Sequence, residues 1–287
     1  DNTDQLILKS TDADANVAVG KGALTTDTLG SYSTALGFAA LEAQNFTSAT
    51  NAYNTAVGAA AGASVTTGVQ NTFIGGLSGD ANTTASNNTA LGYASLSANT
   101  TGTQNTSVGS FSLDANTTGD YNTATGYAAL GAATTATNNT AFGSHALTAN
   151  TTGDTNTAVG KDSMKTNTTG TNNGAFGSRT LQLNTTGTNN VAVGDLALGA
   201  NTTADNNTAV GTSALAANTT GINNVAVGIQ ALDANTTGAE NIGIGSNALG
   251  ANTTADANVA IGGGALAANT TGANNAAVGR SALSSNT

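Results

Sequence analysis

A 17-residue repeat dominates this sequence and limits what the chain can fold into. Sixteen glycines mark it, and neighbouring ones lie 17 residues apart, except Gly37 and Gly58, which lie 21 apart. Self-similarity at a fixed short period is the signature of repeat architectures, in which each unit packs only on its neighbours. The copies follow the consensus N-T-A-V-G-x-x-A-L-x-A-N-T-T-G-x-x, which is almost intact in residues 207–223.

The make-up of the repeat favours strands and turns over helices. Helical solenoid repeats usually run to about 33–47 residues because each contains two helices. Here the unit is short and rich in Thr, Asn, Gly and Val; its T-A-V triplet has the period of a strand, and N-T-T-G is a turn signal. We therefore predict an all-β fold over residues 16–287: a parallel β-solenoid, or β-roll, of sixteen 17-residue coils. Coils stacked about 4.8 Å apart would form a rod of roughly 75–80 Å.

Each column of the repeat carries its own expectation. The marker glycine follows the strand and should make a bend that a Cβ would block. The second glycine becomes alanine at Ala85, Ala136, Ala204 and Ala255, so it should not require a positive φ in every coil. Stacked Asn columns should form amide ladders. The β-branched and aliphatic residues on either side of the central Ala should point inward.

Two observations predict that one chain does not suffice. A coil buries about three apolar side chains, while ordering 17 residues costs on the order of 17–34 kcal/mol of backbone entropy. Ala is a poor strand former, yet it holds the middle strand position in 13 of 16 copies. A uniformly small residue suggests that another backbone packs against that side of the strand, so we expect a side-by-side oligomer.

The motif N-T-A-V-G-x-x-A-L also resembles a known family. It stands intact in Asn207–Leu215 and, with Ser163 and Met164, in Asn156–Met164. This pattern resembles the S-V-A-I-G-x-x-S/A head repeats of trimeric autotransporter adhesins and the repeat arrays of phage and viral tail-fibre-type proteins. The resemblance covers about residues 16–287. It implies a left-handed β-roll, three chains side by side as a homotrimer, and the apolar neighbours of Ala inside each roll. The A-N-T-T-G limb makes this repeat longer than the adhesin one.

Three segments break the pattern. Residues 1–15 include a short strand candidate, Gln5–Lys9, which would either cap the first coil or lie in a groove of another subunit. Residues 42–53 contain the four-residue insertion with Phe46 and Tyr53, and should bulge as a loop. The chain starts without Met, so we expect that it was processed or trimmed. Ser284–Thr287 stops partway through a repeat, which suggests either a longer native protein or an end that stacks onto another molecule.

Candidate chemistry is sparse. His145 is the single histidine and has no evident catalytic partner, so we interpret it as a bystander. Asp12, Asp14 and Asn16 imitate the opening of a calcium loop, but Val17 stands where Gly is needed and no Glu closes the loop. The N-T-T triplets match the glycosylation sequon, but their spacing favours an Asn-Thr turn ladder; they include Asn99, Asn116, Asn150, Asn167, Asn184 and Asn201. We predict no catalytic, cofactor or metal site.

Composition removes further classes of function. The absence of Cys removes disulfides and thiolate chemistry. A net charge of −10 argues against a nucleic-acid partner, and no apolar run approaches the length needed for membrane insertion.

These observations favour a non-enzymatic structural rod of an extracellular trimeric fibre, at a cell surface or on a virion. It would belong to an adhesin head or shaft or to a tail-fibre shaft, and cell-surface glycans are the ligand class considered. One alternative is a secreted subunit that polymerises end to end into a filament. Ice binding through Thr ladders is the third hypothesis, and the less favoured one: neighbouring strand residues point to opposite faces, and the strand Thr column should be internal.

Overall fold

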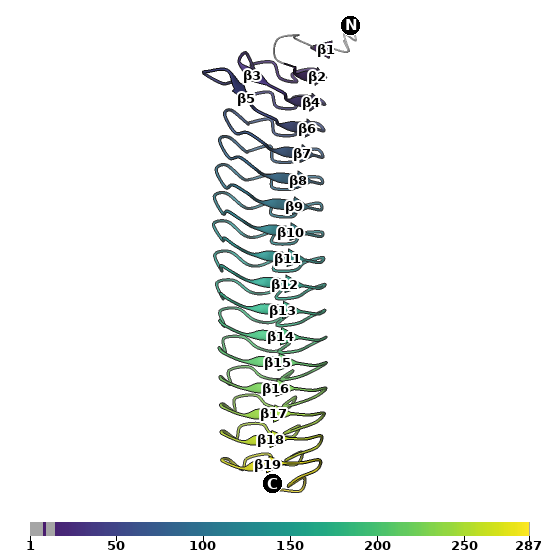
Figure 1. Cartoon of the computed structure of the whole chain (residues 1–287), viewed down its shortest axis with the longest axis vertical. Helices are drawn as coiled ribbons and strands as arrows, with labels where there is room; N and C mark the ends of the chain where they lie inside the picture. Colours follow the sequence, from purple (N-terminus) through teal and green to yellow (C-terminus); the bar gives the residue numbers. More distant parts are fainter. Residues whose placement is uncertain (1–7, 10–14, 287) are drawn as a thin grey trace. The chain divides into compact units, whose positions relative to one another are not determined.

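The structure is a computed structural model that describes residues 8–9 and 15–286. These residues form strands, turns and bends without any helix, and hence no helix that could cross a membrane. The chain divides into two compact units, the first ending at Asn139 and the second beginning at Thr140. Each unit is a stack of parallel β coils (Figure 1), so the predicted all-β parallel solenoid is confirmed.

The first unit stacks seven three-residue strands, one per repeat. Every strand pairs in parallel with the next, and equivalent residues lie opposite each other, as in the pairs Thr72↔Thr89 and Ile74↔Leu91. The register therefore follows the sequence repeat without slippage. The strands are β2 (Val17–Val19), β4 (Thr34–Leu36), β6 (Thr55–Val57), β7 (Thr72–Ile74), β8 (Thr89–Leu91), β9 (Thr106–Val108) and β10 (Thr123–Thr125).

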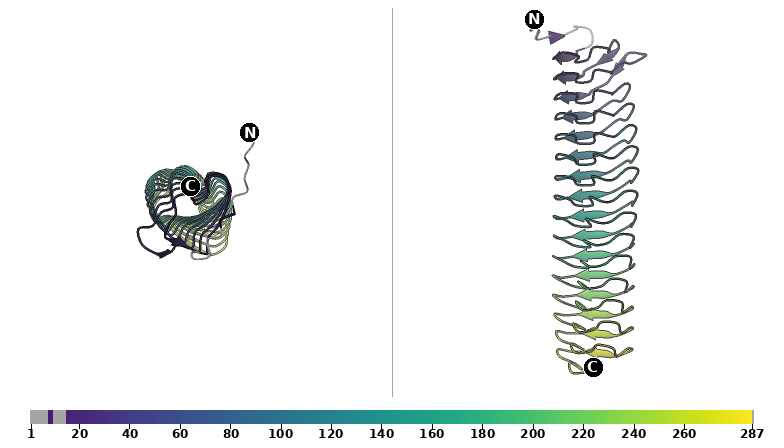
Figure 2. Two further views of the ribbon diagram at one scale, coloured as in Figure 1. Left: turned by 90° about the horizontal axis from the view of Figure 1, so that it is seen from above. Right: turned by 180° about the vertical axis from the view of Figure 1, so that it is seen from behind.

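The second unit repeats this arrangement. Parallel pairing in the same register joins all its strands, for example Val191↔Thr208 and Val193↔Val210. Along the stack, each coil winds once around a narrow interior (Figure 2). The strands are β11 (Thr140–Phe142), β12 (Thr157–Val159), β13 (Gly174–Phe176), β14 (Val191–Val193), β15 (Thr208–Val210), β16 (Val225–Val227), β17 (Ile242–Ile244), β18 (Val259–Ile261) and β19 (Ala276–Val278).

The direction of the strand side chains is the reverse of the prediction. The central Ala points into the coil: Ala90 and Ala209, for instance, have no exposed surface. Its neighbours point outward, and Leu91 is 44% exposed. The expectation that Ala faces another chain, with its apolar neighbours inside the roll, is therefore wrong. The narrow interior explains why: the Leu column, with Leu96 and Leu215 fully buried, already fills it, which leaves room only for a methyl group opposite.

The marker glycines behave as predicted. Gly211 adopts a φ of 136°, and a Cβ there would lie only 2.5 Å from the carbonyl oxygen of Gly228 in the next coil. Close approach of two backbones and a left-handed conformation both require glycine. The second glycine, for example Gly221, is not among the residues with positive φ, which confirms the inference from the alanines in that column.

Two buried amide ladders join successive coils, as expected from the stacked Asn columns. In the first, Asn71 N–H donates to Asn54 Oδ1 at 2.9 Å, and Asn54 Nδ2 donates to the Gly68 carbonyl at 2.8 Å. In the second, Asn184 Nδ2 donates to Asn167 Oδ1 at 2.7 Å. These asparagines have no exposed surface. Each rung satisfies polar groups that a turn-rich interior would otherwise leave unpaired.

The start of the first unit departs from the repeat. β1 (Leu8–Lys9) pairs antiparallel with β2 and covers its edge, so the described part of the Gln5–Lys9 segment forms a cap. Gln5, Leu6 and Ile7 lie outside the described residues.

The insertion bulges as predicted, but it is not only a loop. It contributes β5 (Thr50–Asn51), which pairs with β3 (Gly30–Ser31), and it buries Phe46. Ser33 replaces Asn in the first Asn ladder, and the buried side chain of Gln44 bridges the resulting gap. Its Nε2 donates to Ser33 Oγ at 3.1 Å, and its Oε1 accepts from Asn54 Nδ2 at 2.8 Å.

Candidate functional surfaces

The first and third residues of the three-residue strands form an outward surface that we call the strand face. Neither position holds a charged residue in any of the sixteen coils. In the first unit, Thr fills the first position of every strand from β4 to β10, with mostly aliphatic residues at the third. In the second unit the face is more apolar, and its exposed members are Phe142, Phe176, Val191, Val193, Val210, Ile244, Ile261 and Val278.

The exposed apolar residues of the strand face are neighbours of one another and are not scattered singly over the surface. Single exposed apolar side chains need no explanation, but a contiguous apolar patch marks an interaction surface. Val191 and Val193 are 44% and 38% exposed, and in-register pairing places their equivalents directly beside them in the next coil. The two strand columns thus provide a flat, uncharged surface suited to packing against another flat surface.

A column of exposed threonines runs along another part of each coil. The second Thr of N-T-T is exposed in each described triplet. The first Thr is half-buried in every described triplet except at Thr270, and it can bond the next coil, as Thr100 Oγ1 does to the Thr117 carbonyl at 3.0 Å. The opposite orientation of the two threonines matches the sequence-based argument. The exposed members of this column are Thr67 and Thr135, which follow V-T and A-T, and, in N-T-T triplets, Thr84, Thr101, Thr118, Thr152, Thr169, Thr186, Thr203, Thr220, Thr237, Thr254 and Thr271.

Three exposed rings of the first unit form what we call the aromatic row. Tyr93 and Phe111 lie edge to face with ring centroids 5.5 Å apart, and Phe111 and Tyr127 are arranged likewise at 6.1 Å. Tyr93 and Tyr127 are each 52% exposed, and Phe111 is 36% exposed. This row was not predicted from the sequence. The available signal was a Tyr directly after the marker glycine in two repeats, with Phe one position further on in the repeat between them.

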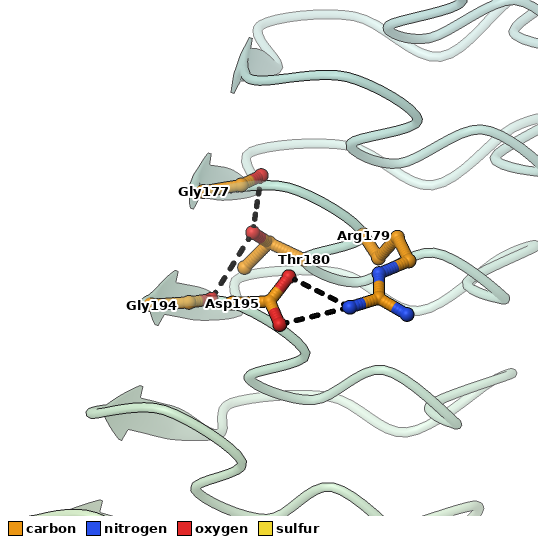
Figure 3. Close-up of polar contacts among 5 residues, drawn as sticks. All are labelled: Gly177, Arg179, Thr180, Gly194 and Asp195. Atoms are coloured by element: carbon orange, nitrogen blue, oxygen red, sulfur yellow. Dashed lines mark hydrogen bonds and ion pairs between the residues drawn. The ribbon is translucent and has the colours of Figure 1, made fainter.

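Charged side chains gather on three successive coils of the second unit. Nη2 of Arg179 contacts both carboxylate oxygens of Asp195 on the next coil, at 3.2 and 2.9 Å (Figure 3). Lys165 Nζ lies 3.1 Å from Asp162 Oδ1, while Lys161 lies 4.0 Å from the same carboxylate. Exposed pairs of this kind contribute about 0–1 kcal/mol each. The cluster contains three basic and two acidic side chains, which form a surface network.

Three half-buried aspartates follow the Leu column. Burial raises the pKa of Asp80, Asp114 and Asp233 above the ordinary value of 3.8, although backbone N–H groups lower it in part. Asp80 Oδ1 is buried and accepts no hydrogen bond. These carboxyls occur singly in separate coils, and burial is the largest cause of each pKa shift.

His145 and Asn16, two residues considered as candidate site residues from the sequence, make contacts with their neighbours in the coils. His145 lies half-buried at a turn with a φ of 59°, and its Nδ1 lies 3.0 Å from Oγ of the adjacent Ser144. This serine partner was not expected from the sequence. Asn16 forms the first rung of the Asn ladder, accepting from Ser33 N–H at 2.7 Å. Asp12 and Asp14 lie outside the described residues.

The N-T-T asparagines form the predicted turn ladder. Asn99 Nδ2 donates to Asn82 Oδ1 and to the Gly102 carbonyl, both at 2.9 Å, and Asn99 has no exposed surface. A glycan on this nitrogen is incompatible with the folded coil. Across the described residues, no group of three or more His, Cys, Asp or Glu side chains is placed to hold a metal ion.

Comparison with known proteins does not assign the chain to a family or a function. No protein-family model, no curated protein and no solved structure matches this chain. The interpretation of its surfaces therefore depends on their own chemistry.

Proposed function

We propose that the chain is a non-enzymatic structural segment of an extracellular trimeric fibre that attaches to surfaces, as an adhesin head or shaft or a tail-fibre shaft does. Three chains lie side by side, with their strand faces turned toward one another. The observation that carries this proposal is the uncharged strand face, which repeats in every coil of both units.

The interface differs from the one expected from the sequence. Ala is inside the coil, so the association uses the aliphatic and Thr side chains on either side of it. Burying a Val or Ile fully contributes about 1.5–3 kcal/mol, and the face repeats such residues coil after coil. The proposal therefore retains the trimer and reassigns the residues that form it.

Sedimentation equilibrium tests the proposal. We expect a single species with the mass of three chains. Val193→Glu with Val210→Glu places charges on adjacent strands of the face and should give monomers. The matched control Thr203→Glu places the charge in the exposed Thr column and should leave the trimer intact. A wild-type monomer, or dissociation by the control alone, contradicts the proposal.

Assembly into an end-to-end filament is the alternative. β1 covers one edge of β2 and thereby occupies an edge that such a polymer would use. Electron micrographs that show continuous fibres in place of discrete particles would favour the filament.

One observation favours a second candidate, ice binding. Thr89 and Thr208, first residues of their strands, lie outside the coil, contrary to the expectation that this column is internal. A rigid, charge-free surface with in-register Thr can order water in a regular array. Thermal hysteresis in a concentrated solution would support this candidate, and its absence removes it.

A further inference from the structure

We propose that the aromatic row of the first unit binds a linear β-1,4-linked glycan whose chain runs along the stack of coils. This deepens the proposed attachment function by naming a ligand class and the residues that bind it. It rests on that function only for its biological meaning, because the binding site lies within one chain.

The spacing of the rings is the first argument. Tyr93 and Tyr127 occupy the same column, directly after Gly92 and Gly126, and are two coils apart. Two strand spacings amount to roughly 9.5 Å. Successive sugars of a β-1,4-linked chain alternate in orientation, so every second sugar presents the same face, and that two-sugar repeat is close to the separation of the two tyrosines.

The ring chemistry is the second argument. A pyranose offers a patch of C–H groups that packs on an aromatic face, while its hydroxyls remain at the edge of the ring. Tyrosine combines an apolar face with a hydrogen-bonding tip, which suits a ligand of this mixed character. The ring of Phe111 contacts both tyrosines and is nearly perpendicular to each, with interplanar angles of 81° and 84°, so it holds them in position.

A carboxylate lies on the same turn as the central ring. Asp114 follows Phe111 by three residues, and the next coil has Gly131 in the same column. A Cβ at Gly131 would lie 3.3 Å from Asp114 Oδ1, so glycine leaves this oxygen free of an overlying side chain. Such an oxygen can accept hydrogen bonds from sugar hydroxyls. The net charge of −10 favours a neutral glycan over an acidic one.

The first unit also supplies a matched control. Tyr121 is 57% exposed and lies in a different column, directly before the Asn that opens a repeat. Its ring takes no part in the contacts that define the aromatic row. Replacing it removes the same chemical group from the same unit without touching the row.

Isothermal titration calorimetry of the full chain with cellohexaose and chitohexaose tests the proposal, with α-1,4-linked maltohexaose as the comparison. We expect binding of at least one β-1,4-linked hexaose. Tyr93→Ala and Tyr127→Ala should each weaken it by about tenfold or more, equivalent to about 1.4 kcal/mol, while Tyr121→Ala leaves it unchanged. Circular dichroism establishes that each variant retains its β structure.

Several outcomes would overturn the inference. The first is that neither β-1,4-linked hexaose binds at millimolar concentration. The second is that maltohexaose binds equally well or more tightly. The third is that Tyr121→Ala weakens sugar binding as much as Tyr93→Ala or Tyr127→Ala does. Binding of a cationic peptide in place of the sugars would assign the row to a protein partner. The trimer is measured separately by sedimentation, so failure of sugar binding with an intact trimer removes this inference alone.

Discussion

At the scale of single residues, the interior is governed by the volume available in each coil. Phe73 occupies the position that holds Ala in most repeats, and it is fully buried. The Leu column is interrupted by glycine in this region: a Cβ at Gly79 would lie 2.5 Å from Phe73 Cδ1, and one at Gly62 would lie 2.8 Å from Cδ2. These three exceptions to the repeat therefore compensate for one another in volume. Phe73 is a large side chain in the Ala column, and Gly62 and Gly79 make room for it in the Leu column.

The exchange predicts coupled mutations. Phe73→Ala should lower the free energy of unfolding by about 3–5 kcal/mol because it leaves a cavity. Gly79→Leu should also destabilise the wild type, since the new side chain meets Phe73, yet it should restore part of the loss in the Phe73→Ala background. Urea unfolding of the four proteins measures the coupling. Additive effects would contradict the packing described.

The backbone conformation of the Leu column suits glycine. Leucines of this column adopt a positive φ, for example 56° at Leu96, and Gly62 and Gly79 adopt 58° and 57°. Glycine is at home in this conformation, whereas Leu is sterically disfavoured in it. The burial of Leu offsets that strain in the other coils.

A gap in the second Asn ladder gives another residue-scale prediction. Ala133 stands where the column otherwise continues with Asn, and Asn116 Oδ1 is consequently buried without a hydrogen-bond partner. Ala133→Asn should donate to that oxygen and raise the free energy of unfolding by about 1 kcal/mol. Ala132→Asn, one position earlier and outside the ladder, is the control. Destabilisation by Ala133→Asn would show that the gap has another cause.

At the scale of the coil, the two glycine columns have different roles. Gly211→Ala should destabilise strongly, by more than the typical cost of about 1 kcal/mol, because of its positive φ and the close approach of the next coil. A Cβ at Gly221 would also approach the next coil, at the Gly238 carbonyl oxygen, so the difference rests on φ. Gly221→Ala should cost less, since its φ is not positive and other coils carry Ala in that column. Thermal unfolding compares the two variants, and equal losses would contradict the assigned roles.

The half-buried aspartates make stability depend on pH. Because burial raises the folded pKa of Asp233, the folded state binds more protons than the unfolded state between the two pKa values. This contribution to stability is present below the unfolded pKa and is lost as pH rises through the folded pKa. Asp233→Asn should therefore stabilise the protein at pH 7 relative to wild type, and by less in acid. Urea unfolding at several pH values measures the difference; a benefit that grows in acid would contradict it.

The sequence predicted the coil more completely than its surfaces. Period, register, glycine bends and Asn ladders follow from identities that recur in nearly every copy. The direction of the strand did not follow, because T-A-V alternates equally well with Ala inside or outside. Only the volume of the Leu column, which fills the narrow interior, decides between the two. The aromatic row could not be predicted from the repeat because it depends on residues that differ between copies.

At the scale of the whole molecule, the central claim is that the strand face is covered by other copies of the chain. Ala192 is buried inside the coil of a single chain, whereas Val191 and Val193 are exposed in it and would be covered in the proposed trimer. Since the chain contains no Cys, single cysteines report on these positions without background.

The most direct test is the rate of maleimide labelling at Val191→Cys, Ala192→Cys and Val193→Cys. Each is measured alone and in the Val210→Glu background, which weakens the proposed interface. We predict that Ala192→Cys is protected in both backgrounds, and that the two flanking cysteines are protected in the first and labelled rapidly in the second. Rapid labelling of both flanking cysteines without Val210→Glu would contradict the account.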